Sequence, residues 1–171
     1  MKNKIQPTNK EIVMRDDDFI VSKTDLKVRI IYANKIFVEF SGFKQTEILN
    51  KQHNMVRHPE MPRAIFNLLW ETISSGHEFN GYVKNMSKTG DFYWVFANVT
   101  PSYSHDQIIG YYSVRRKASK KSLDIIKPLY QEMLIAEKNA TTKTAIDVST
   151  AILTEKLDAS GVGYDQFALS L

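Results

Sequence analysis

The feature that most constrains the fold is a succession of three β-type segments that begins soon after His77. These segments are rich in aromatic and β-branched side chains and cover residues 79–86, 92–103 and 108–115. The stretch 87–91 is typical of a hairpin turn, in which Gly90 can adopt a positive φ, and 104–107 is a further turn. The second half of the chain therefore predicts consecutive antiparallel strands.

Two shorter strands precede this unit, at 19–24 and 29–33, and they are close enough in sequence to pair as a hairpin. Asn34 follows the second strand and can cap a helix that ends at Gly42. Thr46 can cap a further short turn. The order β-β-α-α-α-β-β-β predicts an α+β fold, with one five-stranded antiparallel sheet and helices gathered on one face.

The C-terminal part changes from strand to helix periodicity. Apolar residues recur at helical spacing over 122–138 and again over 141–157. Pro128 lies inside the first of these segments, so we expect a break or kink there. We divide the chain into a loose polar leader (1–18), a sheet-containing domain (19–116) and a C-terminal helical extension (117–171).

Composition excludes several classes of function. The chain has 171 residues, a formal net charge of +4 and no cysteine, so disulfides, thiolate metal sites and flavin–cysteine adducts are excluded. No apolar run has the length of a membrane helix or a signal peptide, and we expect a cytoplasmic location. The basic stretch 115–121 has no interleaved aromatic residues. We interpret that stretch as a solvated junction and expect no nucleic-acid binding.

Enzyme motifs are also missing from the sequence. It has no glycine-rich phosphate loop and no Gly-x-Ser-x-Gly elbow. The carboxylates of 16–18 form a close cluster, but they lie in a polar leader, so we interpret them as solvated. The four histidines do not share a helical face, and no protein metal site is expected.

The stretch 51–62 is irregular, because Pro59 and Pro62 keep it out of a regular helix. Pro62 suits the first position of the helix that follows, whose apolar face includes Phe66 and Trp70. This stretch has two interpretations. In the first it is only a helix entry, in which Arg57 pairs with Glu60 and the aromatic side chains belong to the core.

In the second interpretation the same stretch is a ligand site. Arg57 offers a fork of donors suited to a phosphate, and His58 can both donate and accept. Four aromatic side chains could form flat apolar walls for a planar ligand: Phe66, Trp70, Phe79 and Trp94. The side-chain amides of Asn34 and Asn85 could form hydrogen bonds with the edge of a heterocycle. The residues alone leave both interpretations open.

A family resemblance favours the ligand site. The runs that carry it are ANKIFVEFSGF (33–43), HNMVRHPEMP (53–62), AIFNLLW (64–70), GYVKNMSKTGDFYWVFANVTP (81–101) and GYYSVRR (110–116). Together they resemble the PAS domain of bacterial aerotaxis receptors. The resemblance covers about residues 19–116, and IKPLY (126–130) also follows the PAS core in such receptors.

The resemblance implies non-covalent binding of FAD by a redox sensor that has no enzymatic activity. The positions that support flavin binding or its signalling in that family correspond here to Asn34, Arg57, His58, Glu60, Phe66 and Asn85. The family usually has Asp at the position of Glu60 and Trp at that of Phe79. The first difference adds a methylene and the second removes an indole donor.

The resemblance also implies a signalling partner. Receptors of this family continue into a membrane anchor and a signalling coiled coil, whereas this chain is similar to the stand-alone PAS proteins that act through a chemotaxis transducer. A homodimer is left open. The C-terminal helices and the YDQFALSL tail either dock the partner or simply cover the core.

Three other functions remain as alternatives. A haem-binding PAS sensor would use an axial histidine, for which His53, His58 and His77 are available. A small flavin-dependent reductase would need a substrate pocket, for which we see no dedicated residues. A ligand-free protein–protein module would bind no chromophore.

Overall fold

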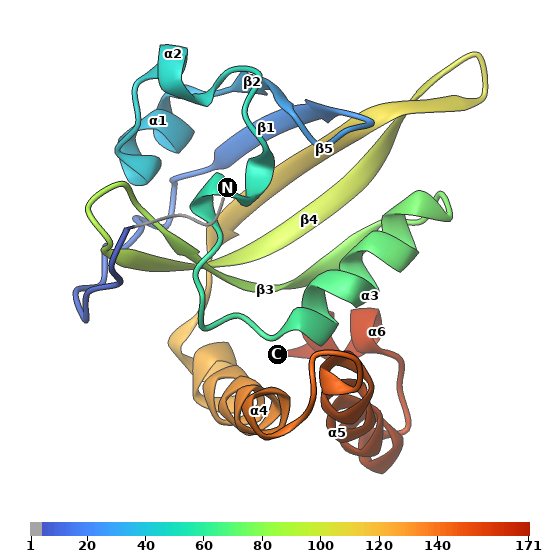
Figure 1. Cartoon of the computed structure of the whole chain (residues 1–171). Coiled ribbons are helices and arrows are strands. Elements are labelled where there is room, and N and C mark those ends of the chain that lie inside the picture. The colour runs from blue at the N-terminus through green and yellow to red at the C-terminus, as the bar shows by residue number, and fades with distance from the viewer. Residues whose placement is uncertain (1–4) are drawn as a thin grey trace.

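A computed structural model describes residues 5–171 of the chain, and Figure 1 shows a curved antiparallel sheet with helices around it. Within these residues the sheet has five strands in the order β2-β1-β5-β4-β3. Their bounds are Ile20–Asp25 (β1), Ile30–Ala33 (β2), Phe79–Met86 (β3), Phe92–Ser104 (β4) and Gln107–Lys117 (β5). The expected α+β architecture and five-stranded sheet are confirmed.

The register of the sheet determines which side chains share its concave face. Ser22 of β1 pairs with Ser113 of β5, which in turn pairs with Val99 of β4. On the neighbouring rung Ala97 of β4 pairs with Arg115 of β5. Because paired residues point to the same side of a sheet, these side chains all face one interior.

Three helices and one short 3₁₀ helix cover this concave face. They are α1 (Lys35–Ser41), α2 (Gln45–Ile48), the 3₁₀ helix η1 (His53–Val56) and α3 (Arg63–Ser74). The Asn34 side chain accepts a 3.0 Å hydrogen bond from the Phe37 amide, and Gly42 ends α1 with φ 68°, as predicted. The Thr46 cap is wrong: Thr46 lies inside α2, which begins at Gln45, and the Glu47 carboxylate accepts from the Lys44 amide instead.

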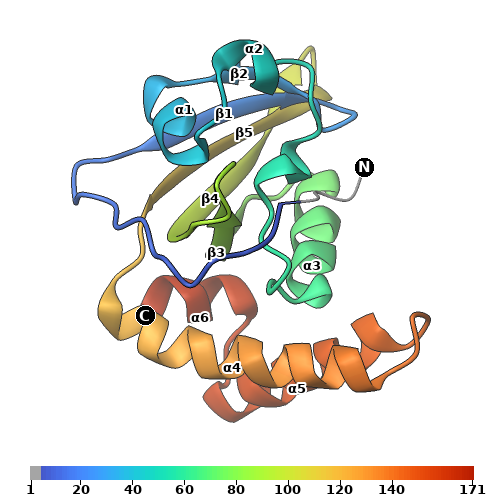
Figure 2. The same ribbon diagram turned by 60° about the vertical axis from the view of Figure 1, so that its left-hand side comes forward.

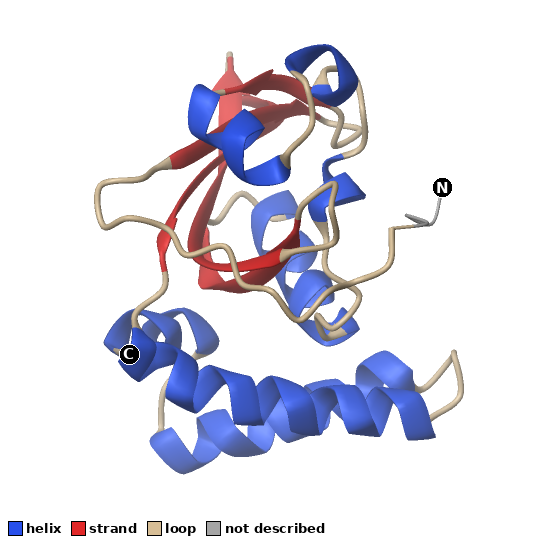
Figure 3. Ribbon diagram, turned by 90° about the vertical axis from the view of Figure 1, so that its left-hand side faces the viewer, coloured by secondary structure: helices blue, strands red, loops and turns tan. Residues whose placement is uncertain are grey.

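The C-terminal helices α4 (Lys120–Asn139), α5 (Ala145–Ser160) and α6 (Tyr164–Ser170) form a layer against β3 and the start of α3 (Figures 2 and 3). The expected break at Pro128 is wrong, because α4 continues through it. Pro128 and Asp124 both lie on the exposed side of α4, where water can satisfy the carbonyl that loses its partner. Among residues 5–171, no helix is long and apolar enough to cross a bilayer.

The described part of the leader, residues 5–18, is not loose. The Thr8 amide donates to the Gly90 carbonyl at 2.9 Å, the Ile12 amide donates to Phe92 at 2.7 Å, and Met14 is buried. Gly90 has φ 90°, and a Cβ there would lie 2.1 Å from the Gln6 carbonyl oxygen. Residues 1–4 of the expected leader lie outside the described residues.

Candidate functional site

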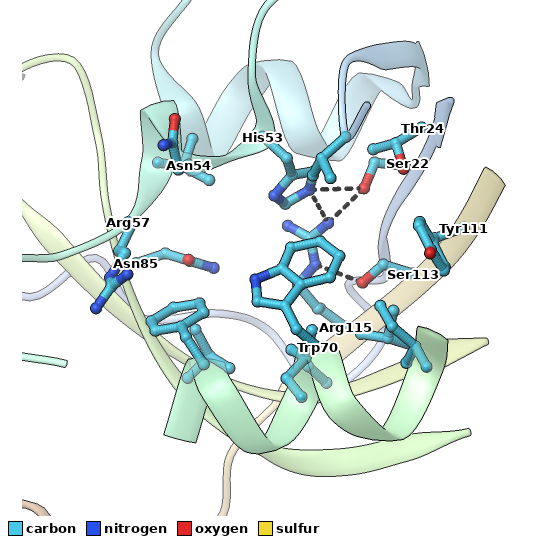
Figure 4. Close-up of a pocket in the computed structure, with 18 of the residues that line it drawn as sticks. Ser22, Thr24, His53, Asn54, Arg57, Trp70, Asn85, Tyr111, Ser113 and Arg115 are labelled. Atoms are coloured by element: carbon cyan, nitrogen blue, oxygen red, sulfur yellow. Dashed lines mark hydrogen bonds between the residues drawn. The ribbon is translucent and has the colours of Figure 1, made fainter. Parts of the chain in front are cut away.

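A cavity of about 330 Å³ lies between the concave face of the sheet, η1 and α3 (Figure 4). This volume is at the lower end of the range of small-molecule sites. Its walls are largely apolar, with polar groups at a few points. The lining residues used in the argument below are Ser22, His53, Arg57, Phe66, Trp70, Asn85, Ser113 and Arg115.

Helix α3 supplies the flat wall of the cavity. Its fully buried residues, such as Ile65, hold the helix to the sheet, while Phe66 and Trp70 line the cavity one turn apart. The Trp70 indole is 37% exposed and meets the Tyr111 ring edge-on, with centroids 5.8 Å apart. A large aromatic side chain at the rim is suited to contact a planar ligand.

Arg57 enters the same space from the end of η1. Its guanidinium carbon lies 3.9 Å from the centroid of the Phe66 ring, and burial lowers the pKa of the guanidinium from its ordinary value. Among residues 5–171 the side chain has no hydrogen-bond or ion-pair partner. The pairing with Glu60 that the helix-entry interpretation requires is not formed, because Glu60 binds Lys84 at 2.6 Å.

Asn85 faces Arg57 across a short backbone bridge that joins the loop to β3. The Asn85 side chain is buried and lines the cavity, and its Nδ2 has no partner among the described residues. A buried amide donor without a partner is costly, so it marks a place where a ligand acceptor would be stabilising.

Arg115 forms the polar back wall of the cavity. Its Nε donates to the Ser113 hydroxyl at 2.9 Å, and its Nη2 donates to the Ser22 hydroxyl and to His53 Nε2, the latter at 2.8 Å (Figure 4). The prediction that Arg115 belongs to a solvated junction is wrong, because it is buried; Arg116 and Lys117 beside it are exposed.

The nine residues predicted for the site do not all meet. The structure brings four of them into the cavity lining: Arg57, Phe66, Trp70 and Asn85. Asn34 instead caps α1, and its amide joins α1 to the start of β1 through the Val21 amide at 3.0 Å and the Phe19 carbonyl at 2.7 Å.

His58 and Glu60 fasten the loop to β3 next to the cavity. His58 is buried, and its Nδ1 accepts a 3.0 Å hydrogen bond from the Glu60 amide. Burial and the charge of Lys84 lower the pKa of His58 to about 4, so it is neutral at pH 7. The Lys84 hydrogen bond to Glu60 lowers the pKa of that carboxyl.

The two remaining aromatic residues that were predicted to form walls of the site do not line the cavity. Phe79 stacks on Tyr164 of α6, with centroids 5.5 Å apart. Trp94 lies 6.1 Å from the Tyr130 ring of α4, and it lines a second hollow of about 250 Å³ together with Glu60, Lys84 and Tyr130. Both contribute to the contact between the sheet and the C-terminal helices.

Comparison with known proteins gives the family. The PAS fold family matches residues 30–115. This chain belongs to the PAS family. The aerotaxis receptor of Escherichia coli (strain K12) is 40% identical over 126 residues, which cover 74% of this chain and 25% of the receptor. The resemblance inferred from the motifs is confirmed.

The chain is also similar to more distant proteins. The nitrogen fixation regulatory protein of Klebsiella oxytoca is 25% identical over 117 residues, which cover 68% of this chain and 24% of that protein. A solved light–oxygen–voltage domain, studied with a flavin analogue, superimposes with a TM-score of 0.57 at 17% identity over 67% of this chain and 86% of that domain. The chain thus spans about a quarter of the length of these two curated relatives.

Sequence reasoning missed the polar back wall of this PAS domain. Ser113 and Arg115 are two positions apart on β5, so their side chains point to the same face of the sheet. Arg116 is the next residue and points to the opposite, exposed face. The available signal was the pair Ser113–Arg115 at spacing two, but Tyr112 and Val114, which alternate with them on the other face of the strand, made the buried face ambiguous. His53 was considered only as a haem ligand.

Proposed function

We propose that this PAS domain is a redox sensor that binds FAD non-covalently in the cavity. The observation that carries the proposal is the composition of the lining: aromatic and aliphatic walls, two guanidinium groups, and neither Asp nor Glu among the described residues that form it. Such a site suits a ligand that combines a flat, apolar ring system with negatively charged groups. A flavin nucleotide has both, because its phosphates carry the negative charge.

The relatives support this assignment by their names. They are an aerotaxis receptor, a regulator of nitrogen fixation and a domain studied with a flavin analogue, so they are sensory proteins. We infer that this chain signals in the same way, from the cytoplasm, to a chemotaxis transducer or a similar partner. Steady NADH oxidation by the purified protein would instead favour the small reductase.

We assign direct roles to the four predicted residues that line the cavity. Arg57 binds the pyrophosphate, Phe66 and Trp70 contact the ring system, and Asn85 bonds the edge of the ring. We assign supporting roles to the others: Asn34, His58 and Glu60 hold α1 and the loop in place, and Phe79 and Trp94 hold the sheet against the C-terminal helices.

The signal in this proposal begins at Asn85. A flavin bound here would gain a proton on reduction, so that a ring acceptor would become a donor, and the amide of Asn85 could respond by rotating. A hydrogen bond contributes about 1 ± 0.5 kcal/mol, enough to shift a two-state balance about fivefold. Asn85 lies on β3, the strand against which α6 packs, and the sheet would carry the change to the C-terminal helices or the partner.

The spectrum of the purified chain tests the cofactor. We expect flavin absorption bands, and we expect the chromophore released by denaturation to co-elute with FAD at one mole per mole of protein. A sharp Soret band would support the haem alternative. A colourless protein that takes up no added FAD would refute the proposal and favour a ligand-free module.

Limited proteolysis tests the signal. We expect dithionite reduction of the FAD-bound protein to change the cleavage pattern of residues 117–171, with Asn85→Ala as the variant that abolishes the change and Asn9→Ala, at an exposed position far along the chain from this segment, as its control. An unchanged pattern in the fully reduced wild-type protein would contradict this route.

A further inference from the structure

Arg115 is a buried cation without a counter-charge. Its side chain is 2% exposed, and its Nη1 has no partner among the described residues. The groups that accept its other hydrogen bonds are the hydroxyls of Ser22 and Ser113 and the ring of His53. A buried charge is costly unless an opposite charge compensates it, and hydroxyl groups compensate only in part.

His53 is a neutral acceptor in this network. Burial and the positive charge of Arg115 lower the pKa of His53 to about 3, so its ring is uncharged at pH 7. A guanidinium can only donate, so the 2.8 Å contact requires a lone pair on His53 Nε2 and assigns the proton to Nδ1. None of the groups that accept hydrogen bonds from Arg115 therefore carries a negative charge that would neutralise it.

The titratable group that acts on Arg115 from the neighbouring strand does not supply a negative charge. Burial raises the pKa of Tyr93 on β4 to about 12, so its phenol is neutral at pH 7. Arg57 adds a second positive charge to the lining. The ring of Phe37 on α1 lies 5.4 Å from the Arg115 guanidinium carbon and is uncharged. The cavity thus has a cation at its rear and another at the loop.

We propose that Arg115 is the anion subsite of the cavity and lies against the part of the bound flavin that becomes negative on reduction. This inference rests on the proposed function. Two electrons and one proton, supplied from outside by dithionite and solvent, convert the neutral oxidised ring into a reduced ring with one negative charge. Arg115 compensates that charge without transferring a proton, and His53 with the two serines holds the guanidinium in position.

The consequence is a reduced flavin that stays anionic. A fixed positive charge in a site of low dielectric constant favours the anion over its protonated form. It also favours the reduced state over the oxidised one, because only the reduced ring carries the additional charge. Arg115 would therefore influence the potential at which this sensor switches.

The test is a redox titration of the FAD-bound full chain and its variants. Arg115→Gln keeps donors but removes the charge, and we expect it to lower the reduced-to-oxidised ratio at fixed potential about tenfold, which is about 30 mV for a two-electron couple. Arg115→Lys keeps the charge and should stay within about threefold of wild type. Arg116→Gln, on the exposed neighbour, should leave the potential unchanged.

A measurement on the wild-type protein keeps the proposal falsifiable if Arg115→Gln does not fold. We expect the reduced bound flavin to take up its next proton at least one pH unit below free reduced FAD in the same buffer. An equal or higher value, or an unchanged potential in FAD-bound Arg115→Gln, overturns the anion subsite and leaves the FAD sensor standing. Failure of the wild-type chain to bind FAD overturns both.

Discussion

The hydroxyl of Tyr130 in α4 donates a 2.9 Å hydrogen bond to the backbone carbonyl of Tyr82 in β3. The same hydroxyl lies 3.0 Å from that of Tyr164 in α6, and the Tyr82 hydroxyl donates to the Ala168 carbonyl at 3.3 Å. Burial raises the pKa of Tyr130 well above its ordinary value, so the phenol stays protonated. The C-terminal helices are thus bonded directly to the strand that carries Asn85.

Removing this hydroxyl should loosen the extension from the sheet. Tyr130→Phe leaves the Tyr82 carbonyl and the Tyr164 hydroxyl short of a partner in a buried place, so we expect the free energy of unfolding to fall by about 1–3 kcal/mol. Urea denaturation measures it. Tyr103→Phe is the control, because Tyr103 is 53% exposed and water can replace its bond to the Gly76 carbonyl. Equal losses in both variants would contradict the role of the buried bond.

The contact between α6 and β3 depends on Gly81. A Cβ at this position would lie 2.6 Å from the Tyr164 hydroxyl and 2.7 Å from the Phe79 ring. We expect Gly81→Ala to displace α6, to cost about 1–3 kcal/mol of stability, and to speed proteolysis of residues 164–171. Gly163→Ala is the matched control, because nothing lies within 4 Å of its Cβ position. A Gly81→Ala protein as resistant as Gly163→Ala would refute this packing argument.

The elements that depend on local patterns were predictable from the sequence, whereas those that depend on tertiary contacts were not. The strand predicted at 79–86 is observed with the same bounds, because its periodicity and turn are local signals. Helix α6 was not predicted: its seven residues are helical because Tyr164 and Phe167 are buried against the sheet. The position of Pro128 also could not be interpreted from the sequence alone. Whether a helix continues through this proline depends on which side of α4 is exposed to water, and tertiary contacts decide that.

The site was predictable only in part for the same reason. Arg57 and Asn85 were identified by their chemistry and by the resemblance, and they do meet in the cavity. Phe79 and Trp94 were assigned to the same walls because they are aromatic, but their neighbours are Tyr164 and Tyr130 of the extension. Sequence chemistry names candidates, and the register of the sheet decides which of them share a face.

The lowered pKa values of His53 and His58 predict how stability depends on pH. The folded-state pKa is about 3 for His53 and about 4 for His58, below the ordinary value of 6.5 in the unfolded chain. Below pH 6.5 the unfolded state therefore binds more protons, and stability falls as the pH falls. Each histidine contributes a slope that approaches about 1.4 kcal/mol per pH unit.

Urea unfolding at pH 7.5, 6.5 and 5.5, at constant FAD occupancy, measures this dependence. Carboxyl groups add little in this range, because they titrate at lower pH in the unfolded chain. We expect His53→Gln, whose amide oxygen can still accept from Arg115, to flatten the curve. His105→Asn, at the exposed β4–β5 turn, should keep the wild-type slope. A His53→Gln curve identical to wild type would mean that folding does not lower the pKa of His53.

We expect Arg57 to contribute strongly to the affinity of the chain for FAD. Its guanidinium has no hydrogen-bond or ion-pair partner among residues 5–171 and stacks on Phe66, so its donors are available to a pyrophosphate. Charge-assisted hydrogen bonds contribute about 1.5–3 kcal/mol, so Arg57→Ala should weaken FAD binding about ten- to hundredfold, as measured by fluorescence titration of the apoprotein. Arg63→Ala, an exposed arginine at the start of α3, should keep wild-type affinity. Riboflavin, which lacks the pyrophosphate, should bind both variants equally; a loss confined to Arg57→Ala with riboflavin would place Arg57 at the ring instead.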